Sequence, residues 1–160
     1  MAGISITVDA SQLEAVTQRL VRRSQVGAVE LMTAIGAIGE SQTRRRITEE
    51  KTGPDGQAWP PNRRGGDILV ETGQHLLGSV AYRASAEEAE WGASWEFAHV
   101  HQNGATIVPK TKKRLSFMLG GKLVHAHKVT IPARPFVGLS AENRREIEDL
   151  VTDWLGRLMA

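Results

Sequence analysis

The sequence predicts an α+β fold with N-terminal helices, a small antiparallel sheet with long loops, and a C-terminal amphipathic helix. Three observations support this prediction. Apolar residues recur at helical spacing near both ends of the chain, they alternate at strand spacing in the middle, and a stretch rich in proline and glycine lies between these patterns. The chain has 160 residues, which is the length of one domain, so we expect residues 1–160 to form a single domain.

The N-terminal part of the chain predicts a strand followed by two helices. Residues 4–8 alternate between branched apolar and polar side chains, as in a half-buried strand. Ser11–Glu14 has the spacing of a capping box that opens a helix, and a second, longer helix is predicted to follow Ser24. That helix should end near Arg44–Arg46, because cations suit the negative end of a helix dipole; we prefer this interpretation to nucleic-acid contact.

Two segments are predicted to be extended loops. Lys51–Asp67 is rich in proline and glycine, and residues 109–122 combine a basic run with two consecutive glycines. Trp59 lies inside the first loop, where an aromatic side chain either folds back on its own domain or meets a partner. Both alternatives stay open for Trp59.

Short elements are predicted between and beyond these loops. Leu69–Ser79 has the pattern of a helical turn that leads into a strand, and the alternation from Val80 to Ala93 is typical of a β-hairpin. Phe97–His101 should form a short helix that ends near Gly104, where glycine suits left-handed backbone. Further strands are predicted at Ile107–Val108 and Leu123–Thr130.

The segment Ile131–Ser140, which we call the strap, is predicted to be stiff. Pro132 and Pro135 fix their own φ angles and favour extended backbone in the residues before them. A pre-ordered segment loses little entropy on docking, so it can present Arg134 and Phe136 to a partner. The alternative is that Phe136 seals the core while Arg134 pairs within its own domain.

The last helix is the clearest element of the sequence. Ser140 is predicted to be its N-cap, and a glutamate follows in the first turn. One apolar stripe runs along it, formed by Ile147, Leu150, Val151, Trp154, Leu155 and Leu158. This spacing predicts an amphipathic helix packed across the sheet.

Charge is distributed unevenly along the chain. The formal net charge is +2, yet no aspartate or glutamate occurs from Phe97 to Ala141. The basic residues of this stretch are Lys110, Lys112, Lys113, Arg114, Lys122, Lys128 and Arg134. Such asymmetry predicts contact with a complementary surface, either between copies of the protein or with DNA.

No motif supports catalysis, a cofactor, a metal or a small-molecule substrate. The chain has no cysteine, no phosphate-binding loop and no nucleophile elbow. Two His-x-His pairs, at His99 and His101 and at His125 and His127, could supply imidazoles to a metal ion. The first pair is expected on a helical turn, where positions two apart diverge. We therefore predict a non-enzymatic protein without metal and, since no apolar run reaches membrane-span length, without membrane contact.

Three groups of residues, in order along the chain, resemble the patterns of a known family. The first group is Asp55–Gly56, Trp59–Pro60, Leu69, Thr72, Gly73, Leu76 and Ser79. The second is Phe97, Ala98, Val100, His101, Gln102 and Gly104. The third is the strap with the helix after it. Together they are similar to the phage virion morphogenesis family, the tail-completion or neck proteins of Mu-like and related tailed phages.

The resemblance implies a structural virion protein of the phage head–tail junction, assembled in the host cytoplasm, that acts in tail completion or head–tail joining. We expect a homo-oligomeric ring of about six copies (six-fold symmetry), because a ring repeats one weak interface many times. Its partners would be other neck, connector and tail proteins, with non-specific contact to packaged DNA as a further use of the basic run. The candidate interface residues are Trp59, His101, Gln102, Lys110, Lys112, Lys113, Arg114, Arg134 and Phe136.

The alternative function is a basic nucleic-acid-binding protein that uses the Lys110–Lys128 region. Its cations can contact phosphates, but no aromatic residue is interleaved with Pro109–Arg114 to stack on bases. The basic run is thus either a solvated hairpin tip or a finger that docks on an acidic neighbour. His101 and Gln102 have similar alternatives: they cap carbonyls or bond to a neighbouring loop, or they lie at an interface.

Overall fold

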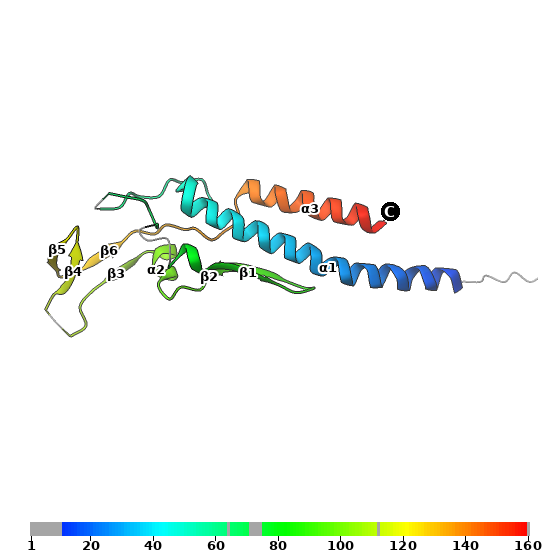
Figure 1. Cartoon of the computed structure of the whole chain (residues 1–160), viewed down its shortest axis with the longest axis horizontal. Coiled ribbons are helices and arrows are strands. Elements are labelled where there is room, and N and C mark those ends of the chain that lie inside the picture. Colours follow the sequence, from blue (N-terminus) through cyan, green and yellow to red (C-terminus); the bar gives the residue numbers. More distant parts are fainter. Residues whose placement is uncertain (1–10, 64, 71–74, 112, 160) are drawn as a thin grey trace, which may run out of the picture.

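The computed structural model describes residues 11–63, 65–70, 75–111 and 113–159, and for parts of the first helix it describes the backbone alone. The molecule is elongated. A long helix forms its axis, a second helix lies along one side of it, and a β-hairpin lies along the other (Figure 1). The strand predicted at residues 4–8 falls outside the described residues.

One continuous helix, α1 (Ser11–Arg45), stands where two helices were predicted. The predicted break near Ser24 is wrong, because no proline interrupts the segment and tertiary packing outweighs the low helix propensity of Gly27. A Cβ atom on Gly27 would lie 2.8 Å from the indole Nε1 of Trp154, so the glycine makes room for that ring. A π-helical turn, η1 (Arg46–Glu50), then ends the helix at Lys51, whose φ is 55°.

The predicted hairpin packs directly on α1. The chain enters it through a 3₁₀ turn, η2 (Leu77–Ser79), and forms β1 (Val80–Ala84) and β2 (Ala89–Ala93). Tyr82 lies opposite Trp91 in the antiparallel register. Both rings lie against α1 at Gly36 and Gly39, since a Cβ atom on either glycine would collide with them. The glycines therefore allow the hairpin to approach the helix backbone closely.

The remaining elements lie beyond and beside this core. They are α2 (Ala98–Asn103), β3 (Ala105–Ile107), β4 (Leu115–Leu119), β5 (Lys122–Ala126), β6 (Val129–Ile131) and α3 (Ala141–Met159). β3 pairs with β6 and β4 pairs with β5, both antiparallel. The α+β class is confirmed, but within the described residues the strands form three two-stranded sheets instead of one. Only the β1–β2 hairpin lies along α1, because the other pairs extend past the end of that helix (Figure 1).

The second predicted loop, residues 109–122, is shorter than expected. β4 occupies its second half and pairs with β5 across Gly120 and Gly121, whose φ angles are 57° and 79°. Two successive positive φ angles suit a tight hairpin turn, so the glycine pair was a hairpin signal that the prediction missed. The strand predicted at Leu123–Thr130 is likewise two strands, because the chain leaves β4 after Ala126 and joins β3 at Val129.

Glycine is required where α2 ends. The helix stops at Gly104 as predicted, but with φ 73° and ψ 162° the residue is extended instead of left-handed helical. A Cβ atom there would lie 2.8 Å from the backbone nitrogen of Ala133. The positive φ and the close approach of the strap therefore both require glycine.

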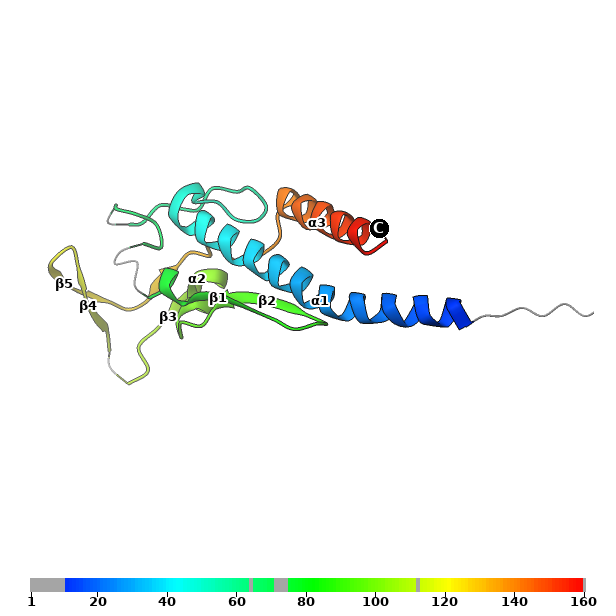
Figure 2. The same cartoon turned by 45° about the vertical axis from the view of Figure 1, so that its right-hand side comes forward.

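α3 begins with the predicted cap, but the prediction that it packs across the sheet is wrong, because its apolar stripe packs along α1 instead. The Asn143 N–H donates to Ser140 Oγ, and the Ser140 N–H donates to Asn143 Oδ1, each at 3.2 Å. The β1–β2 hairpin lies on the other side of α1 from α3 (Figure 2). The apolar stripe is half-buried, apart from Leu155, which is exposed. Within the part of the chain that is described, no helix is both long and apolar enough to cross a membrane.

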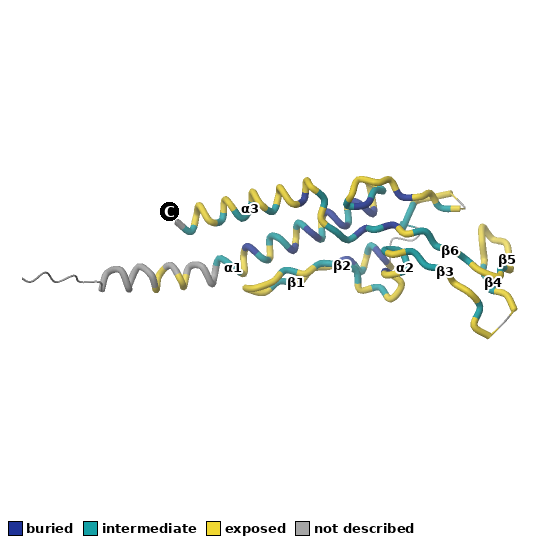
Figure 3. Tube along the Cα trace, turned by 180° about the vertical axis from the view of Figure 1, so that it is seen from behind, coloured by how far each residue is buried: buried dark blue, intermediate teal, exposed yellow. Residues whose placement is uncertain are grey.

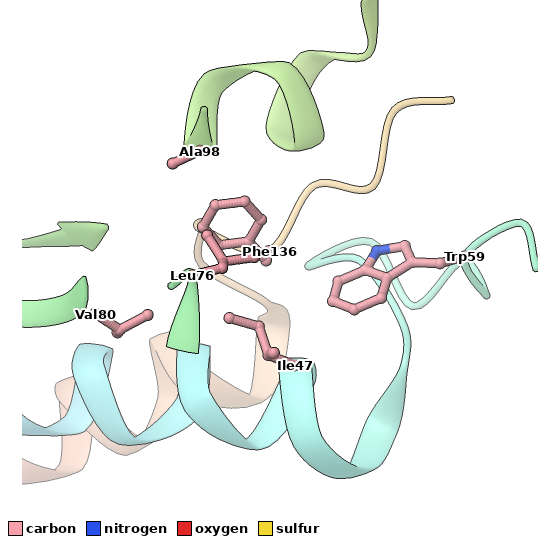
Figure 4. Packing of buried hydrophobic residues seen from close by; sticks show 6 residues of the cluster. All are labelled: Ile47, Trp59, Leu76, Val80, Ala98 and Phe136. Atoms are coloured by element: carbon pink, nitrogen blue, oxygen red, sulfur yellow. The ribbon is translucent and has the colours of Figure 1, made fainter. Parts of the chain in front are cut away.

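The core lies where the end of α1, the strap and the start of β1 meet. Its buried members are Ile47, Trp59, Leu76, Val80, Ala98 and Phe136 (Figure 4). Phe136 is 1% exposed and Ile47 is fully buried. Phe136 therefore takes the alternative in which it seals the core. Outside this junction most described residues are exposed or half-buried (Figure 3).

Two glycine-to-alanine changes test the close packing of α1. Gly39→Ala places a methyl group against the Trp91 ring and should lower the free energy of unfolding by about 1–3 kcal/mol, despite the better helix propensity of alanine. Gly156→Ala on α3 meets nothing within 4 Å and should raise stability by about 0.5–1 kcal/mol. Urea unfolding of both variants measures the contrast. Equal stabilisation by both changes would contradict the close approach of Trp91.

Candidate docking site

Gln102 of α2 holds the strap by three hydrogen bonds. Its Oε1 accepts from the N–H groups of Phe136 at 3.0 Å and Val137 at 3.1 Å, and its Nε2 donates to the Val137 carbonyl at 3.0 Å. The carbonyl of His101 also accepts from the Arg134 N–H at 2.8 Å. The Gln102 side chain therefore bonds to a neighbouring segment, which was one of the alternatives that the sequence left open, whereas His101 bonds to it through its backbone carbonyl.

Arg46 joins the strap to α1 and α3. Its side chain donates to the carbonyls of Phe136 at 3.3 Å and Gly138 at 2.9 Å, and it also binds Asn143 Oδ1. Burial lowers the pKa of Arg46, but a guanidinium remains charged at neutral pH. Arg44, two residues earlier, donates to the carbonyls of Leu77 and Val80. The arginines lie at the helix end as predicted, and Arg44 and Arg46 form specific bonds to other segments in addition to any dipole effect.

The strap and the first loop bind each other. Trp59 Nε1 donates to the Pro135 carbonyl at 3.1 Å, and Arg134 donates to the carbonyls of Pro60 at 2.9 Å and Pro61 at 3.1 Å. Trp59 and Arg134 are each 5% exposed. Trp59 therefore folds back on its own domain, and Arg134 pairs inside it. An interface role for these residues and for Phe136 stays a prediction.

A stack of rings lies beside the strap, and sequence reasoning did not identify it. Trp95 lies between His75 and His101, with ring centroids 5.7 and 5.6 Å apart, and Phe97 meets it edge-on at 5.5 Å. The close spacing of Trp95, Phe97 and His101 in the sequence could have indicated this stack. The stack and Arg134 line a hollow of about 820 Å³. Burial, and secondarily the charge of Arg134, lower the pKa of His101, so its ring is neutral at pH 7.

Beyond the strap, residues 105–131 form a projecting arm. β3 and β6 are its base and the β4–β5 hairpin is its tip, which extends past the end of α1 (Figure 1). The tip packs mainly within itself, although Leu119 reaches the hollow beside Trp95. A two-stranded hairpin with both edges unpaired is only marginally stable in water.

The arm combines exposed apolar side chains with exposed cations. Met118 lies opposite Leu123, and these side chains are 59% and 61% exposed. The exposed basic residues that the structure describes are Lys110, Lys113, Arg114, Lys122 and Lys128. None of these five forms an ion pair with a described residue, and Lys112 lies outside the described residues. The arm thus has the properties of a docking surface.

The histidine pairs lie apart in the structure. His99 and His101 lie on α2, whereas His125 lies on β5 with its Nδ1 2.9 Å from Ser116 Oγ, and His127 follows that strand. Among the described residues, no three histidines or carboxylates come together as a metal-binding group.

Comparisons with known proteins relate the chain to phage proteins. The sequence profile of the phage virion morphogenesis family matches residues 8–156. The chain is also 27% identical over 157 residues to the Mu-like prophage FluMu G protein 2 of Haemophilus influenzae, an alignment that covers 96% of this chain and 99% of that protein. No solved structure gives a significant match.

Removing the Gln102 side chain tests the strap contacts. Gln102→Ala leaves two part-buried backbone N–H groups and one carbonyl without their partner, so the free energy of unfolding should fall by about 2–4 kcal/mol. The neighbouring Asn103 is exposed, and Asn103→Ala on the same helix should change stability by less than about 0.5 kcal/mol. Urea unfolding checks both values, and similar effects for the two variants would contradict the role of Gln102.

The pH dependence of stability tests the buried His101 ring. Its folded pKa lies below the ordinary value of about 6.5, so the unfolded chain binds a proton first as the pH falls. The free energy of unfolding should therefore decrease below about pH 6.5 and level off below the folded pKa. His101→Gln should remove this contribution to the decrease in the free energy of unfolding between pH 7 and pH 5, as measured by urea unfolding. His99→Gln, at an exposed position, should keep it. The same pH dependence in all three proteins would exclude the effect.

Proposed function

The chain belongs to the phage virion morphogenesis family, and we propose that it is a structural protein of the head–tail junction that acts in tail completion or head–tail joining. The family indicates a virion-associated structural role. We further propose that the protein acts by docking and has no enzymatic activity of its own.

One contrast supports a docking role: other segments of the chain bind the strap, whereas the described part of the arm tip packs mainly within itself. Gln102, Arg46 and Trp59 bind backbone groups along the strap. The arm, by comparison, presents open strand edges, exposed cations and the exposed pair Met118 and Leu123. An open edge can add a strand from another protein, and exposed apolar side chains lose water when a partner covers them. A rigid body with an uncovered arm suits a component that joins other proteins.

We propose that the protein works as a homo-oligomeric ring with six-fold symmetry in the neck, where it contacts connector and tail proteins. A ring presents the same arm many times, so modest individual contacts add up to stable attachment. Packaged DNA that passes such a ring would meet the same cations, which gives non-specific phosphate contact as a secondary use.

Charge reversal on the arm tests this function in infected cells. Changing Lys110, Lys112, Lys113 and Arg114 to glutamate should leave the thermal unfolding midpoint within a few degrees, because exposed charges contribute little to stability. The variant should fail to complement a phage that lacks this gene, and electron microscopy should show separate heads and tails. The matched control reverses four exposed arginines outside the arm, namely Arg19, Arg22, Arg145 and Arg157.

The outcomes separate docking from nucleic-acid binding. Normal infectious particles from the arm variant would contradict the docking role. If the purified protein instead binds duplex DNA with an affinity that falls steeply with salt, and the variant loses this binding, the alternative of a nucleic-acid-binding protein is supported.

A further inference from the structure

We propose that the arm of one copy binds the outer face and acidic turn of the β1–β2 hairpin of a second copy. This inference rests on the proposed assembly of several copies, and it names the two surfaces that meet. Both surfaces are parts of the chain that the internal packing leaves uncovered.

Charge complementarity identifies the second surface. Residues 97–141 contain seven basic residues and no acidic one, whereas residues 80–96 contain four acidic residues and one basic one. The acidic residues are Glu87, Glu88, Glu90 and Glu96. α3 also carries acidic residues, but Arg144, Arg145 and Arg157 are interleaved with them, so α3 is a weaker match for a cationic arm.

These carboxylates have few partners in their own chain. Glu90 pairs with Arg83 across the hairpin, and both side chains of that pair are largely exposed. Glu87 and Glu88 lie in the exposed turn between the strands and form no ion pair with a described residue. The turn backbone is held by Ser85 Oγ, which accepts from both of their N–H groups at 3.2 Å. The turn therefore presents negative charge from an ordered backbone.

The hairpin also offers an open face for the apolar residues of the arm. Because Tyr82 and Trp91 pack on α1, the residues next to them in each strand lie on the opposite face. Ala81 and Gly92 face each other there, and a Cβ atom on Gly92 would meet nothing within 4 Å. Ala81 and Gly92 make one part of this face flat, and the exposed Arg83–Glu90 pair lies beside them on the same face. Large side chains such as Met118, which is 59% exposed, can lie against it.

The contact has to form between copies. Figures 1 and 2 show the β4–β5 tip at one end of the long axis and the β1–β2 turn well away from it, beside α1. A single chain cannot bring them together while the strap holds the base of the arm. A contact between two different surfaces of the same chain is head-to-tail, and it generates a ring when the rotation closes.

A charge exchange tests the pairing. Arm variant Lys113→Glu with Arg114→Glu, and turn variant Glu87→Lys with Glu88→Lys, should each self-associate about tenfold or more weakly than the wild type in sedimentation equilibrium, because each places like charges together. An equimolar mixture of the two variants should regain association, since the arm of each then meets a turn of opposite charge. A chain with all four changes should also associate alone.

Disulfide trapping gives a second measurement, because the chain contains no cysteine. Leu123→Cys mixed with Gly92→Cys should give a cross-linked dimer under mild oxidation, whereas Leu123→Cys mixed with Ser41→Cys, exposed on α1, should not. A wild-type protein that stays monomeric at about 1 mM and forms no arm-to-hairpin cross-link would overturn the proposal.

The result also separates this inference from the proposed function. Suppose that the mixture of variants does not regain self-association, while the variant with all four arm cations reversed still blocks head–tail joining. The arm then binds a different neck protein, and the copy-to-copy contact is wrong. If head–tail joining proceeds normally with the arm variant, the docking function itself is wrong.

Discussion

An extended segment that contains prolines and joins no sheet after its first residue still has to satisfy its buried backbone groups, and the structure depends on how the strap does this. Gln102 supplies one donor and one shared acceptor to Phe136 and Val137, as a neighbouring strand would. Arg46 supplies donors from the end of α1, and Trp59 supplies one from the first loop. Each of these contacts ties a different part of the chain to the strap, so the core forms around it.

This arrangement divides the molecule into a fixed body and an uncovered arm. The strap begins where the arm ends, at Ile131, and Arg134 is anchored three residues later by the carbonyls of Pro60 and Pro61. The base of the arm is therefore held in place, while its tip packs mainly within itself. A fixed base lowers the entropy lost when the tip binds, which favours docking through modest contacts. The arm cations stay available because the body provides them with no described carboxylate partner.

The candidate site was predictable in part. The absence of acidic residues from 97 to 141 predicted a basic contact surface, although not the projecting arm that carries it, and the prolines of the strap predicted a stiff segment. The sequence could not decide whether Trp59, Arg134 and Phe136 point inward, because a rigid segment with an arginine and an aromatic residue suits a core and an interface equally well. The ring stack around Trp95 was missed, since it depends on His75, which lies 20 residues earlier and meets Trp95 only in the folded chain.

Local patterns determined the elements whose signals lie within a few residues: the cap at Ser140, the amphipathic C-terminal helix, the β1–β2 hairpin and the α+β class. Tertiary structure decided the features that depend on distant partners. α1 continues through Gly27 because Trp154 fills the space beside it, and the described strands form three separate pairs, of which the β1–β2 pair packs on α1. Spacing along the chain reports local backbone preference, whereas burial depends on which segments meet in space. The arginine triplet therefore suits a helix dipole in the sequence, whereas in the folded protein Arg46 holds the strap and Arg44 holds the start of the β1–β2 hairpin.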